Sequence, residues 1–252
     1  MVDAVVLAGS PNNGPLRECS TVSHEALIPL GAKTMVEYVV DALLRARQVG
    51  RVLIIGPTED LAGLPFDQRT STAPSQGGIL ENIGVGLNIL SDAKRILLVT
   101  SDIPLLTPQA VDDFLELCED MGGDLYFPVI EKMVVEEKFP AARRTYVKLK
   151  EGVFTGGNLF LLNPTVYKKC MENGGKIISL RKSPLALCRM LGVRFVIKFL
   201  MHLLTLKEAE EKVCRLLGGI KGVVVVSRYP EVGVDVDKPG DYELVLKAIK
   251  RD

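Results

Sequence analysis

Tryptophan is absent from the sequence, only His24 and His202 supply imidazoles, and the five cysteines are scattered without a C-x-x-C pair. An odd number of widely separated cysteines indicates the reduced thiols of a cytoplasmic protein rather than a disulfide framework. Zinc sites draw on clustered cysteine and histidine, and this chain offers almost none of either at suitable spacing. Any bound metal is therefore expected to be a hard cation with oxygen ligands.

An excess of charge of one sign is lacking as well, because 31 Lys and Arg residues balance 31 Asp and Glu residues. Proteins that bind nucleic-acid polymers neutralise many phosphates with clustered basic residues, so we expect no nucleic-acid partner. The most apolar later stretch, residues 193–206, is interrupted by charged side chains. It is also shorter than the roughly 20 residues that a membrane span needs. The first apolar run is too short for a signal peptide, so a cytoplasmic protein without stable membrane insertion is predicted.

Short runs rich in Val, Ile and Leu alternate with longer helical patterns, which is typical of β-α-β units. Nearly continuous apolarity predicts strands covered on both faces at residues 4–8, 52–55 and 96–100. Further strands are predicted at residues 125–129, 144–150, 158–162 and 223–227. Helices are expected at residues 34–49, 78–90 and 108–121, and after Pro239. The fold class that follows is a three-layer α/β/α arrangement around a mixed, mainly parallel sheet.

Residues 164–218 depart from this alternation and form an almost unbroken helical pattern, with a capping-box sequence from Thr205 to Glu208. We interpret them as a helical insertion in a single domain that spans residues 1–252.

Arg194, Lys198 and His202 of this insertion recur every four residues and would share one helix face. The simpler interpretation is the solvated face of a core-packing helix. The alternative is a basic helix over residues 181–202, which adds Arg181, Lys182 and Arg189 and contacts an anionic acceptor or an anionic membrane surface.

Polar residues follow two of the predicted strands. The turn Leu7-Ala8-Gly9-Ser10, followed by Gly14, is rich in glycine. Glycine lets backbone N–H groups approach phosphates closely, so this turn is a candidate phosphate-binding loop. An ordinary turn between a strand and a loop is the alternative. Ser101 and Asp102 follow the strand at 96–100, where a carboxylate is placed rigidly, as a magnesium ion that bridges triphosphate oxygens requires. A local turn aspartate is the competing interpretation for Asp102.

Asp235 and Asp237 alternate with valines, and along a strand this pattern would direct both carboxylates to one face. Two carboxylates that face the same way need a cation or solvent to relieve their repulsion. Asp237 could instead cap the helix that begins near Pro239, and both interpretations can hold together.

Four segments occur in order: Leu7-Ala8-Gly9, Ala-Leu-Ile-Pro-Leu-Gly at 26–31, Thr-Ser-Asp-Ile-Pro-Leu-Leu at 100–106 and Asp-Val-Asp-Lys-Pro-Gly-Asp at 235–241. In that order and spacing the chain resembles the MobA-like NTP transferase family over about residues 2–163 and 220–250. The resemblance implies the nucleotide-diphospho-sugar transferase type of fold, with its glycosyltransferase-A-type nucleotidyltransferase topology.

The resemblance also implies roles for individual residues. Nucleotide contacts are expected from Leu7, Ala8, Gly9, Ser10, Gly14, Ser101, Ser75, Gly77, Gly78 and Asn82. Asp102 would bind Mg²⁺, and one or both of Asp235 and Asp237 would complete the metal site. The segment Thr155, Gly156, Gly157 and Asn158 resembles the strand start that faces the acceptor.

Two positions depart from the pattern of this family, which usually has a second glycine after Leu-Ala-Gly and a lysine just before the Ala-Leu-x-Pro-Leu segment. Ser10 and Glu25 stand there instead. A cation on the triphosphate stabilises the leaving pyrophosphate, and loss of such a group typically costs on the order of 10² to 10³ in rate. Arg17 joins Asp102 as a candidate catalytic residue for this reason, and the alternatives are Lys33, Arg143, Arg144, Arg181 and Lys182.

We therefore predict a magnesium-dependent nucleotidyltransferase that joins a nucleoside monophosphate to a small phosphorylated acceptor and releases pyrophosphate. A phosphate nucleophile needs no general base, in keeping with the scarcity of histidine. Two alternatives stay open, a glycosyltransferase that uses a nucleotide-sugar and a catalytically degenerate nucleotide-binding protein. The expected partners are an NTP and a small anionic acceptor, and a homodimer is compatible with the sequence.

Overall fold

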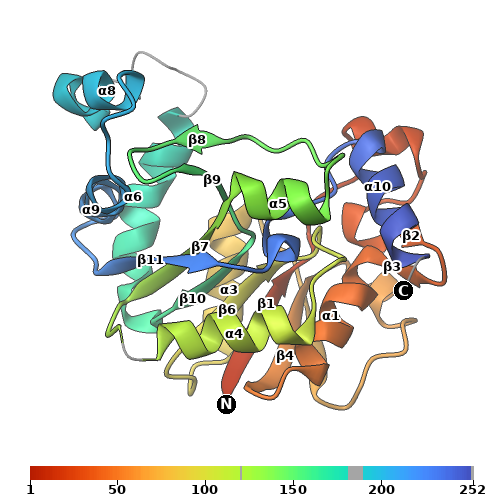
Figure 1. The fold of residues 1–252 in the computed structure, drawn as a ribbon. Helices are drawn as coiled ribbons and strands as arrows, with labels where there is room; N and C mark the ends of the chain where they lie inside the picture. Colours follow the sequence, from red (N-terminus) through yellow and green to blue (C-terminus); the bar gives the residue numbers. More distant parts are fainter. Residues whose placement is uncertain (120, 181–189, 251–252) are drawn as a thin grey trace.

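The computed structural model describes residues 1–119, 121–180 and 190–250, and nine strands of these residues form one sheet (Figure 1). The strands are β1 (Val2–Leu7), β4 (Val49–Gly56), β5 (Thr70–Pro74), β6 (Ile96–Thr100), β7 (Leu125–Glu131), β8 (Val147–Lys148), β9 (Val153–Gly156), β10 (Leu159–Leu162) and β11 (Gly222–Ser227). Their order is β5-β4-β1-β6-β10-β7-β9-β8, with β11 beside β7. Of the described strands, β9 and β10 run against the others, which confirms a mixed, mainly parallel sheet.

Helices cover both faces of this sheet. On one face lie α1 (Met35–Arg45) and α4 (Pro108–Cys118), and on the other lie α3 (Ile79–Ile89) and α6 (Tyr167–Leu180) (Figure 1). Side chains of β1 alternate between the two faces, because Ala4 and Val6 belong to the buried cluster with α1 and α4, whereas Val5 belongs to the cluster with α3. The predicted three-layer α/β/α fold is confirmed.

Smaller elements complete the fold. The other α-helices of the described residues are α2 (Thr58–Leu61), α5 (Lys132–Lys138), α8 (Val193–Leu200), α9 (Leu206–Leu216) and α10 (Pro239–Ile249). A two-stranded sheet pairs β2 (Pro29–Leu30) with β3 (Lys33–Thr34), and the one-turn helices η1 (Pro15–Glu18) and η4 (Pro230–Gly233) lie in loops. Thr107 caps α4 as predicted, because its Oγ1 accepts a hydrogen bond from the N–H of Ala110 at 3.2 Å.

Two predicted strands differ from the structure. Within residues 144–150, pairing is limited to β8, and residues 234–237 form no strand. Val236 instead makes one backbone hydrogen bond, from its N–H to the carbonyl oxygen of Asp102 at 2.9 Å. Both stretches have the alternation of a strand, but a strand also needs a neighbouring backbone along its whole length, and alternation does not supply one.

The predicted insertion contains α6, α8 and α9, and Thr205 caps α9 through the predicted capping box with Glu208. The shared basic face is wrong, because α8 ends at Leu200 and His202 lies beyond it with a φ of 56°. Lys198 is paired with Glu208 of α9. A continuous helix over 181–202 is wrong as well, because Gly192 precedes α8 with a φ of 88° and α8 ends at Leu200. Arg181, Lys182 and Arg189 lie outside the described residues, so a contact of this region with an anionic acceptor or membrane surface stays a prediction, as does the single domain. None of the helices that the structure describes is long and apolar enough to cross a membrane.

Candidate active site

The carboxyl ends of β5, β4, β1 and β6 meet at one edge of the sheet. Strand β10 runs in the opposite direction and therefore begins at this edge, where the N–H of Thr100 donates to the carbonyl oxygen of Asn158 at 3.1 Å. Loops beyond the carboxyl ends of parallel strands form the usual ligand crevice of an open α/β sheet. The turn after β1, the start of α3, Asp102 and Asn158 thus all lie along this crevice.

Gly9 packs directly against the segment that precedes α3. A Cβ atom at Gly9 would lie 2.6 Å from the Cβ of Ser75 and 3.4 Å from the Nδ2 of Asn82. Asn82 is buried and holds this segment in place, because its Oδ1 accepts a hydrogen bond from the N–H of Gln76 at 2.6 Å. Gly77 has a φ of +62°, which favours glycine. The structure therefore brings together the two segments that were predicted to bind the nucleotide.

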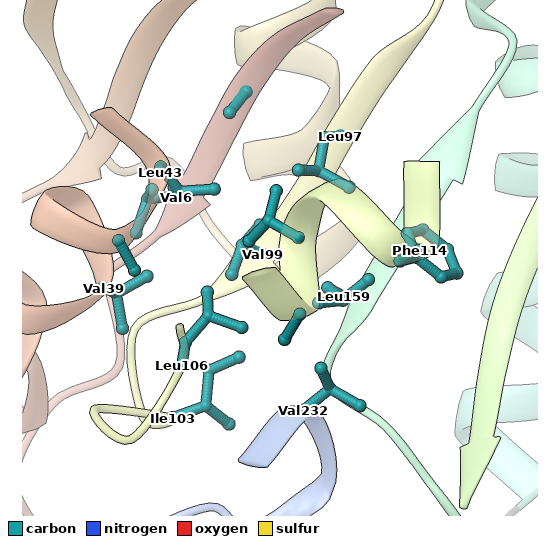
Figure 2. Close-up of a cluster of buried hydrophobic side chains, with 14 of the residues drawn as sticks. Val6, Val39, Leu43, Leu97, Val99, Ile103, Leu106, Phe114, Leu159 and Val232 are labelled. Carbon is teal, nitrogen blue, oxygen red and sulfur yellow. The ribbon is translucent and has the colours of Figure 1, made fainter. Parts of the chain in front are cut away.

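Asp102, Asp235 and Asp237 also come together, and each offers a carboxylate oxygen within 4.8 Å of the other two. The bond from Val236 to the carbonyl of Asp102 holds the two segments side by side. Ile103 and Val232, which flank these segments, belong to one buried cluster (Figure 2). Three carboxylates in reach of one point are a donor set that suits a hard cation such as Mg²⁺.

The capping role considered for Asp237 is wrong. Helix α10 is capped by Asp241, whose Oδ2 accepts hydrogen bonds from the N–H of Lys238 at 3.1 Å and of Asp237 at 3.3 Å. The carboxylate of Asp237 is exposed and takes no part in the cap. It remains available to the group of three.

The pKa of Asp102 is raised to about 6, mainly by burial and in smaller part by the neighbouring charges of Asp237 and Glu25, whereas the hydrogen bond from the Thr100 hydroxyl opposes the shift. A carboxylate at the end of a buried strand has lost water and faces like charges, so its ionised form is disfavoured. A bound divalent cation reverses this balance by adding positive charge at the same point.

The raised pKa of Asp102 makes the stability of the metal-free protein depend on pH. The folded pKa of about 6 lies above the usual 3.8, so the stabilising contribution of protonated Asp102 is complete below 3.8 and is lost as pH rises through about 6. A shift of this size corresponds to roughly 3 kcal/mol. Asp102→Asn removes the titration, and urea unfolding in EDTA should show the variant gaining stability over the wild type between about pH 4 and about pH 7.5. A stability difference that is the same at both pH values would contradict the shift.

Glu25, which stands in place of the expected lysine, is hydrogen-bonded to Ser10, the other residue that departs from the family pattern. Its Oε2 accepts a hydrogen bond from the hydroxyl of Ser10 at 2.9 Å, and its N–H donates to the carbonyl oxygen of Ser10 at 3.1 Å. A Cβ atom at Gly14 would lie 3.9 Å from its Oε1. The carboxylate thus lies against the loop predicted to hold the phosphates, and the two replacements form one local unit.

A pocket of about 360 Å³ adjoins the three carboxylates on the side of β9 and β10. All four residues predicted to bind the acceptor line it, together with Asp235 and Asp237 and with the basic residues Arg143, Arg144 and Lys238. Lys238 was missed in the sequence, although its position directly after Asp237 could have indicated it.

The structure shows which of the candidate cations lie beside the three carboxylates and which do not. Arg17 is exposed in η1, and its Nη1 donates to the carbonyl oxygen of Asn12 at 3.4 Å, whereas Lys33 is paired with Asp41. Arg144 forms an ion pair with Asp235 inside the carboxylate group. Of the candidates in the described part of the chain, Arg143 and Arg144 thus line the pocket beside the three carboxylates, and no described contact links Arg17 or Lys33 to these carboxylates.

Comparison with known proteins gives both a sequence relative and a full-length structural match. A curated protein, 2-C-methyl-D-erythritol 4-phosphate cytidylyltransferase from Klebsiella pneumoniae subsp. pneumoniae, is 31% identical over 134 residues. This match covers 51% of the chain and 57% of that protein, so the chain spans little more than half the length of the relative. A solved structure described as a hypothetical transferase from Thermus thermophilus is 37% identical, with a TM-score of 0.82 over 96% of this chain and 99% of that chain.

A more distant likeness concerns the fold alone. The structure of 4-diphosphocytidyl-2C-methyl-D-erythritol synthase from Anaerococcus prevotii matches with a TM-score of 0.62 at 8% identity, over 100% of this chain and 96% of that chain. The family model of the MobA-like NTP transferase domain matches residues 4–173, which is more than half of the 252-residue chain. The chain therefore belongs to the MobA-like NTP transferase family.

Proposed function

We propose that this protein is a magnesium-dependent nucleotidyltransferase, which transfers a nucleoside monophosphate from an NTP to a small phosphorylated acceptor and releases pyrophosphate. The observation that carries the proposal is the convergence of Asp102, Asp235 and Asp237 at the carboxyl edge of the sheet. This group adjoins the turn at Gly9 through the N–H of Ser101, which donates to the carbonyl oxygen of Leu7 at 3.2 Å. It adjoins the pocket at residues 155–158 on the other side.

Each part of the site has a task in this proposal. Bound Mg²⁺ supplies positive charge to the triphosphate and the leaving pyrophosphate, and Asp102, Asp235 and Asp237 would hold it. Backbone N–H groups of the turn after β1 bind phosphates, and the segment before α3 binds the base or ribose. An oxygen of the acceptor phosphate attacks the α-phosphorus, and the bond to pyrophosphate breaks. Because the nucleophile is already an anion, no residue has to take a proton, and positioning provides most of the catalysis.

The test is a screen of the four NTPs against sugar-, polyol- and cofactor-phosphates, with pyrophosphate release as the readout. The Klebsiella relative is named for cytidylyl transfer to a polyol phosphate, so CTP with polyol phosphates is the first combination to measure. Release of a nucleoside diphosphate from a sugar nucleotide would instead identify a glycosyltransferase. Thermal stabilisation by nucleotides without turnover on any acceptor would identify a binding protein.

Glu25→Lys is expected to strengthen NTP binding and to raise the rate of transfer by about 10-fold to 100-fold, because it replaces a negative charge near the phosphates with the cation that stabilises the leaving group. Glu25→Gln is the matched control, since it removes the charge while keeping a partner for Ser10. Calorimetry with Mg²⁺ and NTP should place Glu25→Gln between the wild type and Glu25→Lys. Weaker binding by Glu25→Lys than by the wild type would show that the carboxylate itself takes part in binding.

A further inference from the structure

Arg144 reaches the three carboxylates from a loop segment, residues 142–146, that belongs to no strand or helix. Along this segment partly covered side chains alternate with exposed ones, so Arg144 is partly covered and its neighbour Arg143 is exposed at the rim of the pocket. The side chains of Arg144 and Asp235 are only 15% and 13% exposed, and the two form an ion pair. Asp235 is one of the three carboxylates that could hold a metal. The guanidinium and a divalent cation therefore compete for the same carboxylate.

Two buried donors of the adjoining pocket lack partners. The Nε of Arg144 and the Nδ2 of Asn158 make no hydrogen bond to any described residue, and both residues line the pocket of about 360 Å³. A buried donor without a partner costs free energy, and a ligand that accepts a hydrogen bond from it would remove that cost. The two donors belong to different segments. Both nitrogens can only donate hydrogen bonds, so they suit a ligand with acceptor oxygens, such as an anion.

We propose that Arg144 is the counterion of Asp235 in the metal-free protein, that a divalent cation displaces it, and that the released guanidinium then binds the phosphate of the acceptor beside Asn158. The inference rests on the proposed function, because it takes the metal site and the acceptor pocket from there. It adds a named residue and an order of events to them.

The physical basis is that a nearly buried carboxylate needs a positive partner in every state of the protein. Arg144 supplies it before the cation binds, and the cation supplies it afterwards. An arginine remains charged throughout and presents a planar fork that matches phosphate oxygens, which a lysine does not. Metal and phosphate then favour the same state of Arg144, so each increases the affinity for the other. The arrangement would delay binding of the acceptor phosphate until the cation is in place.

The experiment measures two affinities by calorimetry, that of the metal-free protein for Mn²⁺ and that of the Mn²⁺-loaded protein for inorganic phosphate. In Arg144→Gln, Mn²⁺ should bind roughly 10-fold tighter, because the cation no longer has to displace a guanidinium from Asp235. Inorganic phosphate should bind roughly 10-fold weaker to the same variant, because the fork that receives it is gone.

The matched control is Lys148→Gln, which removes one positive charge from an exposed position on β8. It should change neither affinity by more than about twofold, as expected for a screened surface charge. Arg144→Lys keeps the charge and should restore Mn²⁺ affinity to the wild-type value while phosphate remains weaker. It also provides the two readouts if Arg144→Gln does not fold.

The results that overturn the inference are distinct. Equal Mn²⁺ affinities in Arg144→Gln and the wild type would exclude the exchange, and unchanged phosphate affinity would exclude the acceptor contact. Asp235→Asn tests the underlying metal site. If it binds Mn²⁺ as tightly as the wild type does, the proposed site is wrong, and the inference fails with it for a reason that does not concern Arg144.

Discussion

Asp102→Asn is expected to abolish Mg²⁺-dependent NTP binding and to lower the rate of nucleotidyl transfer by about 10³-fold or more. Asparagine keeps the shape of the side chain but removes the charge that attracts a hard cation. Asp102 lies two residues after β6, a buried strand, so its backbone position is fixed by the sheet. Calorimetry with NTP in the presence and absence of Mg²⁺, together with pyrophosphate release, measures both effects.

The control for this variant is Asp92→Asn. Asp92 follows α3 away from the carboxylate cluster, pairs with Arg51, and has a side chain that is 69% exposed. Its replacement should leave NTP binding and turnover as they are in the wild type. Asp102→Asn should fold, because it removes a buried carboxylate whose ionised form is disfavoured. Unchanged Mg²⁺-dependent binding in a folded Asp102→Asn protein would refute the metal assignment.

The central strands could be predicted because their residues report burial on both faces. The apolar runs at residues 4–8, 52–55 and 96–100 correspond to β1, β4 and β6, which lie side by side in the middle of the sheet. Strand β5 could not be found in this way, because Thr70, Ser71 and Thr72 at the sheet edge show no apolar run. Helix α5 was also missed. The antiparallel insertion of β10 between β6 and β7 depends on which strands meet in space, and a local pattern does not contain that information.

The grouping of Asp102, Asp235 and Asp237 was predicted for a reason that was only partly right. Residues 234–237 were expected to form a strand, and the alternation does place Val234 and Val236 in the interior. The convergence of Asp235 and Asp237 with Asp102 instead results from a single backbone bond and from the packing of Val232 and Ile103 in the same core cluster. The pattern of buried and exposed positions was thus enough to predict the direction of the side chains, but not the backbone hydrogen bond that holds the segment in place.

The partners of the charged residues could not be predicted, because each is brought in from another part of the chain. Ser10 and Glu25 are 15 residues apart and bonded to each other. Arg144 and Asp235 come from segments on either side of the helical insertion. The alternation along residues 142–146 could have shown that Arg144 is partly covered, but not that it pairs with Asp235. Charge pairing between distant segments is decided by tertiary packing. The sequence alone therefore could not show which of the candidate cations lies near the carboxylates.

Gly9→Ala is expected to lower the rate of transfer by about 10²-fold, the effect of a displacement of about 1 Å in a positioned ligand. The new Cβ would lie 2.6 Å from the Cβ of Ser75, closer than two carbon atoms can approach. The Cβ of Ser75 cannot rotate away, so the turn after β1 must move relative to the start of α3. Overpacking of this kind typically also costs about 1 to 3 kcal/mol of stability. Steady-state kinetics and urea unfolding of the variant measure the two effects.

Gly63→Ala makes the same chemical change at a glycine outside the site, where the nearest atom to the new Cβ is the carbonyl oxygen of Asp60 at 3.7 Å. It should leave both rate and stability close to those of the wild type. Ser75→Gly offers a second test, because it removes the atom that the new Cβ would strike. If the contact is the cause, Gly9→Ala combined with Ser75→Gly should recover most of the stability lost in Gly9→Ala. Failure to recover would mean that the stability lost in Gly9→Ala does not come from contact with Ser75.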